Sequence, residues 1–369
     1  PKDPLISISS FLSNVDIQSF KTVSKEFRSA NSATQLNVKP GTLYLASKIT
    51  NYKTQNMIKT LKLIRCNVEN VDFSRFTQLE EISLFAAYNQ TPNQINQLPD
   101  TLKILNLKEC DVANVNFSRF SQLEEISLDW PQNLTPNQIN QLPTILKKIN
   151  FLGCNVANVD FRRFPQLEEI NLYNAQNLTP NQINQLPTTL KKINLNGCDA
   201  TGFDFSLFSQ LEEIKLKYSE NLTSNQISQL PSTLKKINLY CCDVYEFDFS
   251  RFTQLEEIEL GHTENQTLNQ INQLPTTLKK INLDGCNVAD VDFSRFTQLE
   301  EIHLDSTKKL TTNQINQLPS TLKTLNFLGC NVANVDFRRF TQLKIIEVRY
   351  AKNFSDEQRA QLPTSCKIF

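Results

Sequence analysis

The sequence predicts an α/β solenoid, in which short coils of chain stack so that their strands form a parallel sheet. The first observation is self-similarity, because leucines recur every 44 residues in two phases along most of the 369-residue chain. One phase comprises Leu79, Leu123, Leu167, Leu211, Leu255, Leu299 and Leu343, and the other comprises Leu98, Leu142, Leu186, Leu230, Leu274, Leu318 and Leu362. The second observation is that each unit of 44 residues holds two shorter units of 23 and 21 residues that open with the same phrase. A unit this short cannot bury its own apolar face, so neighbouring units must stack into one continuous core.

The short units carry a recognisable pattern. One kind, from Leu146 to Val156, reads L-x-x-I-x-F-x-x-C-x-V, and the other kind, from Leu123 to Leu128, repeats its first half. With conservative replacements this pattern is L-x-x-L-x-L-x-x-C-x-L, which resembles the leucine-rich-repeat family. The resemblance covers roughly residues 42–369. It implies a horseshoe-like solenoid with a parallel sheet on the concave side and short helices on the convex side.

The segments that return from one strand to the next carry two alternating signals. In one, Thr135-Pro136-Asn137-Gln138 places a capping hydroxyl, a proline at the first helical position and a glutamine at the third, which predicts a short capped helix. Equivalent helices are expected after Thr91, Thr179, Thr223, Thr267, Thr311 and Ser355, each ending before the proline of a Gln-Leu-Pro phrase. In the other signal, phenylalanines three apart, such as Phe161 and Phe164, share one side and are expected to be core.

Composition argues against several classes of function. The 38 Lys+Arg balance 38 Asp+Glu, whereas a protein that binds nucleic acid through phosphates is usually basic on one face. The 7 glycines are not clustered into a phosphate-binding loop, and 2 histidines without a CxxC pair argue against a zinc site. No run of about 18 apolar residues predicts a membrane span. With no Ser/His/acid or Cys/His set at plausible spacing, we expect a protein that is not an enzyme and has no cofactor, metal, nucleic-acid partner or membrane partner.

Seven of the 9 cysteines share one phase of the repeat: Cys66, Cys110, Cys154, Cys198, Cys242, Cys286 and Cys330. Strands of a sheet lie about 4.8 Å apart, so cysteines two coils apart are separated by roughly 10 Å, beyond the ~7 Å limit for a disulfide. We therefore expect buried free thiols that satisfy backbone groups at the bend after the strand. Free thiols in such number predict a reducing compartment, which is the cytoplasm, or the host cytosol for a secreted bacterial effector. Sequons such as Asn133-Leu134-Thr135 are interpreted as the start of the capped helices.

Pairs of like charges alternate between strands. One strand type carries lysine pairs, such as Lys147-Lys148 and Lys235-Lys236. The other strand type carries glutamate pairs at the same position, such as Glu124-Glu125 and Glu212-Glu213. In a parallel stack these pairs become alternating basic and acidic rungs, which disfavours a coil slipped by one. The glutamate pairs could alternatively be catalytic or metal-binding. Because a row of lysines lies on each side of them, we do not favour this interpretation.

The copies differ most near the strand ends. In lysine-type strands the central outward residue is constant, which indicates a scaffold role for Asn106, Asn150, Asn194, Asn238, Asn282 and Asn326. In glutamate-type strands this position and two that follow the strand vary, and they include the sole tryptophan and both histidines. Aromatic and arginine side chains on a solvated concave face are typical of protein-binding hot spots, whereas neutral drift would not favour Trp and Tyr. The predicted partner-binding residues are Phe85, Trp130, Tyr173, Lys215, Tyr218, Tyr240, His262, His303, Arg349 and Tyr350.

The first residues, 1–35, precede the repeats of residues 36–369 and are expected to form two short amphipathic helices, from Pro4 to Leu12 and from Asp16 to Phe27. The wording from Ser10 to Ile17, followed by Val23 to Arg28, resembles the F-box family. This resemblance implies a substrate receptor of an SCF-type (cullin-RING) ubiquitin ligase that binds a Skp-type adaptor and presents an unidentified protein substrate on its repeats. The residues given the adaptor-binding role are Leu5, Ile8, Leu12, Ile17, Phe20 and Val23.

An alternative stays open for the same segment. Repeat proteins need their open ends capped, so the two helices could serve only to cover the first coil. The protein would then be an F-box-independent leucine-rich-repeat scaffold or an enzyme inhibitor.

Overall fold

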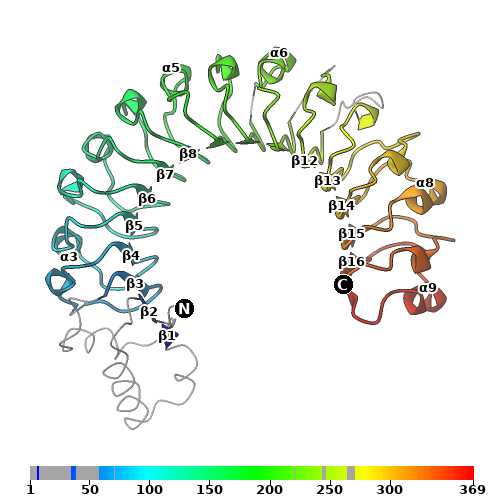
Figure 1. The fold of residues 1–369 in the computed structure, drawn as a ribbon, viewed down its shortest axis with the longest axis horizontal. Helices are drawn as coiled ribbons and strands as arrows, with labels where there is room; N and C mark the ends of the chain where they lie inside the picture. Colours follow the sequence, from blue (N-terminus) through cyan, green and yellow to red (C-terminus); the bar gives the residue numbers. More distant parts are fainter. Residues whose placement is uncertain are drawn as a thin grey trace, which may run out of the picture. The chain divides into compact units, whose positions relative to one another are not determined.

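The computed structural model describes residues 58–69, 71–219, 221–242, 247–263 and 271–369, together with the backbone of two strands at 6–7 and 35–38. The chain divides into two compact units, Pro1–Pro187 and Thr188–Phe369. Within each unit the strands line one side and the short helices line the opposite side (Figure 1). The predicted solenoid of stacked strand-and-return coils is confirmed.

The strands of unit 1 pair in parallel, each with the next one along the chain. They are β1 (Ile6–Ser7), β2 (Gln35–Val38), β3 (Thr60–Leu63), β4 (Glu81–Ser83), β5 (Ile104–Asn106), β6 (Glu125–Ser127), β7 (Lys148–Asn150) and β8 (Glu169–Asn171). The register is set by the repeat, since Ile126 of β6 lies opposite Ile149 of β7 with both side chains in the core. One buried residue between two outward ones is the pattern expected of a strand, because successive side chains point to opposite faces of the sheet.

Unit 2 follows the same rule from β9 to β17. Its strands are β9 (Lys192–Asn194), β10 (Glu213–Lys215), β11 (Lys236–Asn238), β12 (Glu257–Glu259), β13 (Lys280–Asn282), β14 (Glu301–His303), β15 (Thr324–Asn326), β16 (Ile345–Glu347) and β17 (Lys367–Ile368). Because every connection between paired strands is one full coil, no hairpin is needed and all pairs run in the same direction.

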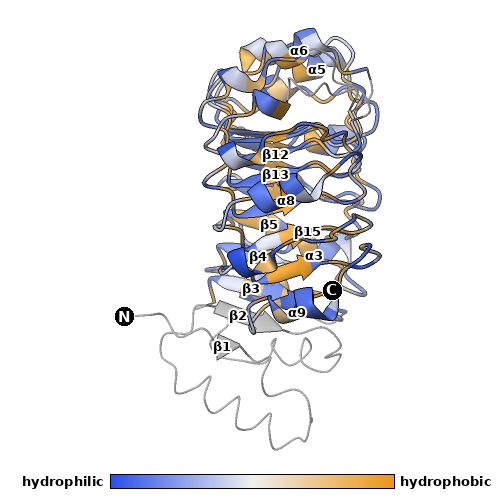
Figure 2. Cartoon of the chain, turned by 90° about the vertical axis from the view of Figure 1, so that its right-hand side faces the viewer, coloured by the Kyte–Doolittle hydropathy of each residue, from blue (hydrophilic) through white to orange (hydrophobic). Residues whose placement is uncertain are grey.

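The short helices begin where the sequence predicts, at residues with a complete capping box. They are α3 (Pro92–Asn96), α4 (Pro136–Ile139) and α5 (Pro180–Ile183) in unit 1, and α6 (Ser224–Ser228), α8 (Thr312–Gln317) and α9 (Asp356–Ala360) in unit 2. The helix expected after Thr267 lies outside the described residues. The helices are largely hydrophilic, as α8 and α9 show in Figure 2.

The glutamine of each capping box has a second structural role, which was not predicted from the sequence. Gln138 is buried, and its amide Nε2 donates to the carbonyls of Val112 and Val115 on the preceding coil at 2.7 and 3.1 Å. Its Oε1 accepts the backbone N–H of Thr135 at 3.0 Å. One side chain therefore caps its helix and also joins two coils, and the same bonds recur at Gln94, Gln182, Gln226, Gln314 and Gln358.

The alternate return segments contain 3-10 turns that begin at the predicted core phenylalanines. These turns are η3 (Phe73–Arg75), η4 (Phe117–Arg119), η5 (Phe161–Arg163), η6 (Phe205–Leu207), η7 (Phe249–Arg251), η8 (Phe293–Arg295) and η9 (Phe337–Arg339). Both rings of each pair are buried, and Phe73 and Phe76 contact each other with centroids 6.3 Å apart. The prediction that these rings are core is confirmed.

The beginning of the chain differs from the expectation at one place. Ile6–Ser7 forms β1 and pairs with Leu36 and Asn37 of β2, so the helix expected from Pro4 to Leu12 is wrong at these two residues. An added parallel strand satisfies backbone groups at the sheet edge. The strand β2 pairs in turn with β3, so the stack of coils includes residues 35–38. The rest of the two predicted helices lies outside the described residues.

Candidate partner-binding edge

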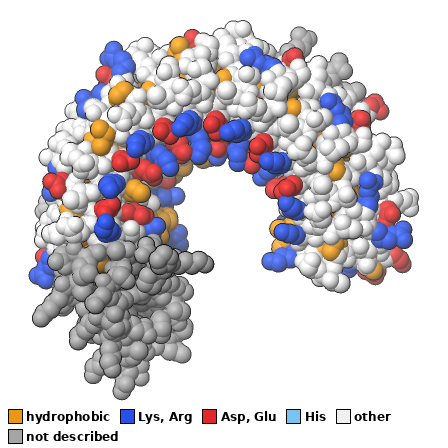
Figure 3. All heavy atoms as spheres, in the orientation of Figure 1, with side chains coloured by type: hydrophobic (Ala, Val, Ile, Leu, Met, Phe, Trp, Pro, Cys, Tyr) orange, Lys and Arg blue, Asp and Glu red, His pale blue; other side chains and the backbone are white. Residues whose placement is uncertain are grey.

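The outward side chains of the strands form alternating basic and acidic rungs, as predicted (Figure 3). In unit 1, Lys147 Nζ lies 2.7 Å from Glu124 of the preceding coil, and Glu80 binds both Lys59 and Lys103 at 2.7 and 2.9 Å. Hydrogen bonds from these two lysines lower the pKa of Glu80 to about 2. The pairs of unit 2 are Lys235–Glu212, Lys236–Glu257, Lys279–Glu256, Lys280–Glu301 and Lys323–Glu300. Each exposed pair contributes only about 0.2–1 kcal/mol, so their main effect is to fix the register of the coils.

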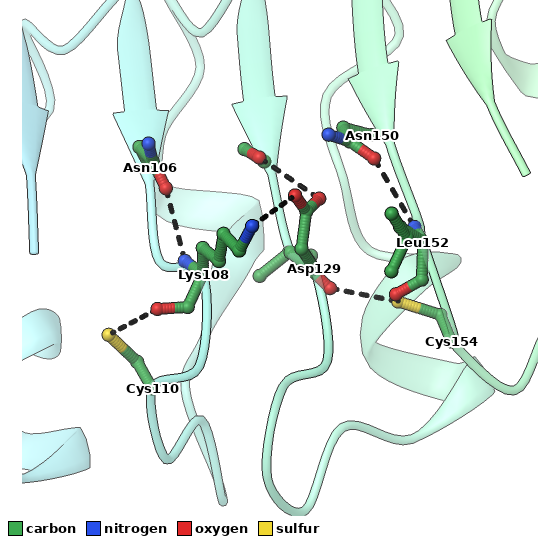
Figure 4. Close-up of polar contacts among 9 residues, drawn as sticks. Asn106, Lys108, Cys110, Asp129, Asn150, Leu152 and Cys154 are labelled. Carbon is green, nitrogen blue, oxygen red and sulfur yellow. Dashed lines mark hydrogen bonds and ion pairs between the residues drawn. The ribbon is translucent and has the colours of Figure 1, made fainter. Parts of the chain in front are cut away.

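The constant asparagines and cysteines hold the bend that follows each strand (Figure 4). Asn150 Oδ1 accepts the backbone N–H of Leu152 at 3.2 Å, so each asparagine caps its own strand. Cys154 Sγ donates to the carbonyl of Leu128 on the preceding coil at 2.9 Å. All seven in-phase cysteines are buried and outside disulfides, as predicted, and burial raises the pKa of the Cys110 thiol to about 12. The scaffold role expected of these two positions is confirmed.

The third residue after each strand from β4 to β16 adopts a left-handed backbone conformation. The residues at this position are Ala86, Glu109, Trp130, Gly153 and Asn174 in unit 1, and Gly197, Tyr218, Cys241, His262, Gly285, Ser306, Gly329 and Tyr350 in unit 2. Positive φ suits Gly and Asn and costs other L-residues roughly 1–2 kcal/mol. Trp130 at φ 46° and Tyr218 at φ 58° are therefore held against the backbone preference. We call the second and third residues after each strand the strand-end edge.

Glycines make room for the large rings of this edge. A methyl group on Gly153 would overlap the ring of Trp130. A methyl group on Gly261 would lie 2.6 Å from the ring of Tyr240, and one on Gly285 would lie 2.7 Å from the ring of His262. In each case the ring projects over the equivalent residue of the next coil. Ring and glycine therefore form a pair one coil apart at these three places.

In unit 2 the rings of the edge form a continuous row of Tyr218, Tyr240 and His262. The centroids of Tyr218 and Tyr240 lie 6.0 Å apart with planes at 82°, and those of Tyr240 and His262 lie 5.3 Å apart at 66°. Lys217 Nζ lies over both tyrosine rings, 4.9 Å from the Tyr218 centroid and 4.1 Å from the Tyr240 centroid. Burial raises the pKa of Tyr240 to about 12. The row thus presents edges and faces of three rings beside one cation.

In unit 1 the edge carries separate rings. Phe85 lies between two cations, with Arg65 5.7 Å and Lys108 4.9 Å from its centroid. Lys108 Nζ also lies 3.8 Å from the carboxylate of Asp129, as Figure 4 shows. Asp129 is buried, and this burial raises its pKa. Trp130, beside it, remains 49% exposed.

The other predicted partner-binding residues divide into two groups. Three of them contact a carboxylate within their own strand or bend: Lys215 pairs with Glu213 at 3.0 Å, Arg349 pairs with Glu347 at 2.8 Å, and His303 Nε2 lies at hydrogen-bond distance, 2.7 Å, from Glu301. Two tyrosines differ in exposure, since Tyr173 is half-buried and Tyr350 is 83% exposed. The structure thus places all ten residues on the strands or the edge, and it assembles Tyr218, Tyr240 and His262 into one surface.

The adaptor-binding residues predicted from the sequence are not among the residues that the structure describes. The six residues given the adaptor-binding role, Leu5, Ile8, Leu12, Ile17, Phe20 and Val23, lie outside the described residues. In the described part of the chain, no three His, Cys, Asp or Glu side chains are grouped so that they could hold a metal ion. No helix among those described is long and apolar enough to span a bilayer.

Solved structures with a similar fold are repeat proteins. A leucine-rich-repeat protein of Leptospira interrogans has a TM-score of 0.62 and 17% identity over 94% of this chain and 98% of its own. The chain has the leucine-rich-repeat fold. An internalin of Listeria monocytogenes gives a TM-score of 0.52 and 15% identity over 86% and 87% of the two chains. The circular leucine-rich-repeat protein CroV588 gives 0.50 and 16%, and this chain spans about half of it, 53%.

No protein-family model matches the sequence, and no curated protein matches it. Identities of 15–17% carry the fold and nothing finer.

Proposed function

We propose that this protein is a non-catalytic interaction module that holds a partner protein on its strand face and against the strand-end edge. The observation that carries the proposal is the presence of Trp130, Tyr218 and His262 at left-handed positions where glycine or asparagine is less strained. Strain of this kind persists where function requires a particular side chain. Exposed tryptophan and tyrosine side chains are also the residues that contribute most to protein interfaces.

We further propose that the partner is a substrate of an SCF-type ubiquitin ligase. The F-box-like wording from Ser10 to Arg28 supports this role, because it would couple a Skp-type adaptor to the repeats within one chain. The buried cysteine thiols, which are not in disulfides, support a reducing compartment such as the cytosol, where such ligases act. The alternative, a scaffold or enzyme inhibitor without an adaptor, uses the same edge and differs only in the role of the first residues.

Site-specific crosslinking tests the binding edge. A photoreactive phenylalanine analogue is placed at Trp130 or Tyr218, and in matched controls at Asn137 of α4 or Asn225 of α6, which are exposed on the helix side. We expect one discrete protein adduct from the edge positions and none from the helix positions. Equal crosslinking from both sides would show that the edge is not the binding surface.

Adaptor binding is tested separately. Purified full-length protein should retain a recombinant Skp-type adaptor, and replacement of both Leu12 and Ile17 by Asp should abolish retention, since charge would enter an apolar interface. If the unmodified chain retains no adaptor while the edge still yields its adduct, the protein is an interaction scaffold outside the ligase.

A further inference from the structure

Three charged side chains on the strand-end edge of unit 2 differ from the paired charges of the rungs. Among the described residues, Lys217, Asp284 and Asp305 have no oppositely charged partner within ion-pair distance. Lys217 Nζ instead lies over the rings of Tyr218 and Tyr240. Asp284 accepts the backbone N–H of Asp305 at 2.8 Å, and Asp305 accepts the hydroxyl of Ser306 at 2.7 Å. Because these three charges form no ion pair with another described residue, they can meet an opposite charge on another molecule.

These groups follow one another in a fixed order across the coils. Lys217 follows β10, Tyr240 follows β11, His262 follows β12, Asp284 follows β13 and Asp305 follows β14. The edge of unit 2 therefore passes from a cation, over two rings, to two carboxylates. Strands lie about 4.8 Å apart, so three steps separate Lys217 from Asp284 by roughly 14 Å. An extended chain covers this distance with about four residues, at roughly 3.3–3.6 Å each.

The carboxylate end is suited to a positive charge. Burial raises the pKa of Asp284, while the hydrogen bond from the backbone N–H of Asp305 and the charge of His303 on β14 partly oppose this rise. An ammonium or guanidinium group placed there would replace lost hydration with a charge-assisted hydrogen bond. Nucleic acid fits poorly, because its phosphates would meet two carboxylates at this end. A polypeptide can supply both signs of charge at the required spacing.

We propose that the strand-end edge of unit 2 binds one extended segment of the partner protein that runs across the strands. A carboxylate of the segment lies at Lys217, an aromatic or proline residue packs on Tyr240 and His262, and a Lys or Arg four positions from the carboxylate lies at Asp284 and Asp305. This inference rests on the proposed binding function and adds the chemistry of the bound segment.

Peptide selection tests the spacing and the signs of charge. A random 12-residue peptide library displayed on phage is selected on the full-length protein, with Asn225→Ala on the helix side as the matched control. Enriched peptides are expected to share an acidic and a basic residue four positions apart with an aromatic or proline between them. Binding of a synthetic consensus peptide should fall at least about tenfold in Lys217→Glu and in Asp284→Lys, as measured for close charge pairs at interfaces.

A charge swap separates loss of recognition from loss of folding. The double variant Lys217→Glu/Asp284→Lys should bind the consensus peptide with its acidic and basic residues exchanged, which an unfolded protein cannot do. Selections that yield no enriched peptide, or peptides without this spacing, overturn the inference. If the crosslinks at Tyr218 persist in that case, the proposed binding function stands and only the chemistry of the segment is wrong. Loss of the crosslinks as well would refute both.

Discussion

The rungs of the strand face and the strand-end edge lie only a few residues apart in each coil, yet they differ in how their residues repeat and in how their charges are paired. On the rungs, residues repeat from coil to coil and many charges form an ion pair with the opposite charge of a neighbouring coil, as Lys279 does with Glu256 at 2.9 Å. On the edge, residues change from coil to coil, and Lys217 and Asp284 form no ion pair within the part of the chain that the structure describes. Repetition in such a chain marks side chains that bind neighbouring coils, and departure from it marks side chains that the stack does not require.

The largest expected effect breaks the repeated part. Gln138→Ala removes the helix cap and leaves the buried carbonyls of Val112 and Val115 without their donor. The loss of a cap and of two buried hydrogen bonds should lower the free energy of unfolding by about 2–4 kcal/mol. Urea unfolding measures this change, and hydrogen exchange should show that it centres on the coil of residues 110–116.

The control for this variant is Gln141→Ala in the same return segment. Gln141 is exposed, so its replacement should change stability by less than about 0.5 kcal/mol. Neither variant should affect crosslinking from Trp130 under conditions where the protein is folded. A fully stable Gln138→Ala protein that fails to bind its partner would contradict the division between scaffold and edge.

Alkaline pH gives a second, smaller test of the same division. Burial raises the pKa of Cys66 to about 11 and that of Cys110 to about 12, above the ordinary value of about 8.5. The unfolded chain releases these protons first, so the stabilisation is complete below about pH 8.5 and is lost as pH rises toward the folded-state values. Each thiol should steepen the fall in stability by about 1.4 kcal/mol per pH unit within this window.

Serine variants assign the effect to position. In Cys110→Ser the hydroxyl can still donate to the carbonyl of Leu84, but it does not titrate, so the alkaline slope should shrink by about one proton. Cys241→Ser on the edge should change the slope less, because Cys241 is only partly buried. Equal slopes in both variants and the parent protein would show that the buried thiols do not govern alkaline unfolding.

The parts of this molecule that sequence could predict are those that rest on local repetition. The period fixed the register of strands such as β6 and β7, and the capping phrase fixed the start of α4, because each depends on residues close together in the chain. The second role of Gln138 was missed because its partners lie on the preceding coil.

The ring and glycine pairs correspond to a regular spacing in the sequence. Gly153, Gly261 and Gly285 follow Trp130, Tyr240 and His262 by one short unit, 23, 21 and 23 residues. The left-handed conformation at Trp130 could not be inferred from residue type, since tryptophan does not favour it. Only the constant bend of the neighbouring coils places it there.

The smallest expected effect concerns strain on the edge itself. Tyr350 has a left-handed backbone conformation, with φ 57°, and its side chain is 83% exposed. Packing of the ring therefore offsets little of the backbone strain. Tyr350→Asn puts a residue there that accepts this conformation, as Asn174 does at φ 51°, and should raise the free energy of unfolding by a few tenths to about 1 kcal/mol. Tyr88→Asn is the matched control, because Tyr88 is an exposed tyrosine without a positive φ and should gain nothing. Thermal melting of both variants measures the difference, and crosslinking measures the cost to binding. A gain in stability with weaker partner capture is the result expected if tyrosine is kept for recognition. A loss of stability in Tyr350→Asn would mean that the ring packs on the coil, and the argument from strain would then fail at this residue.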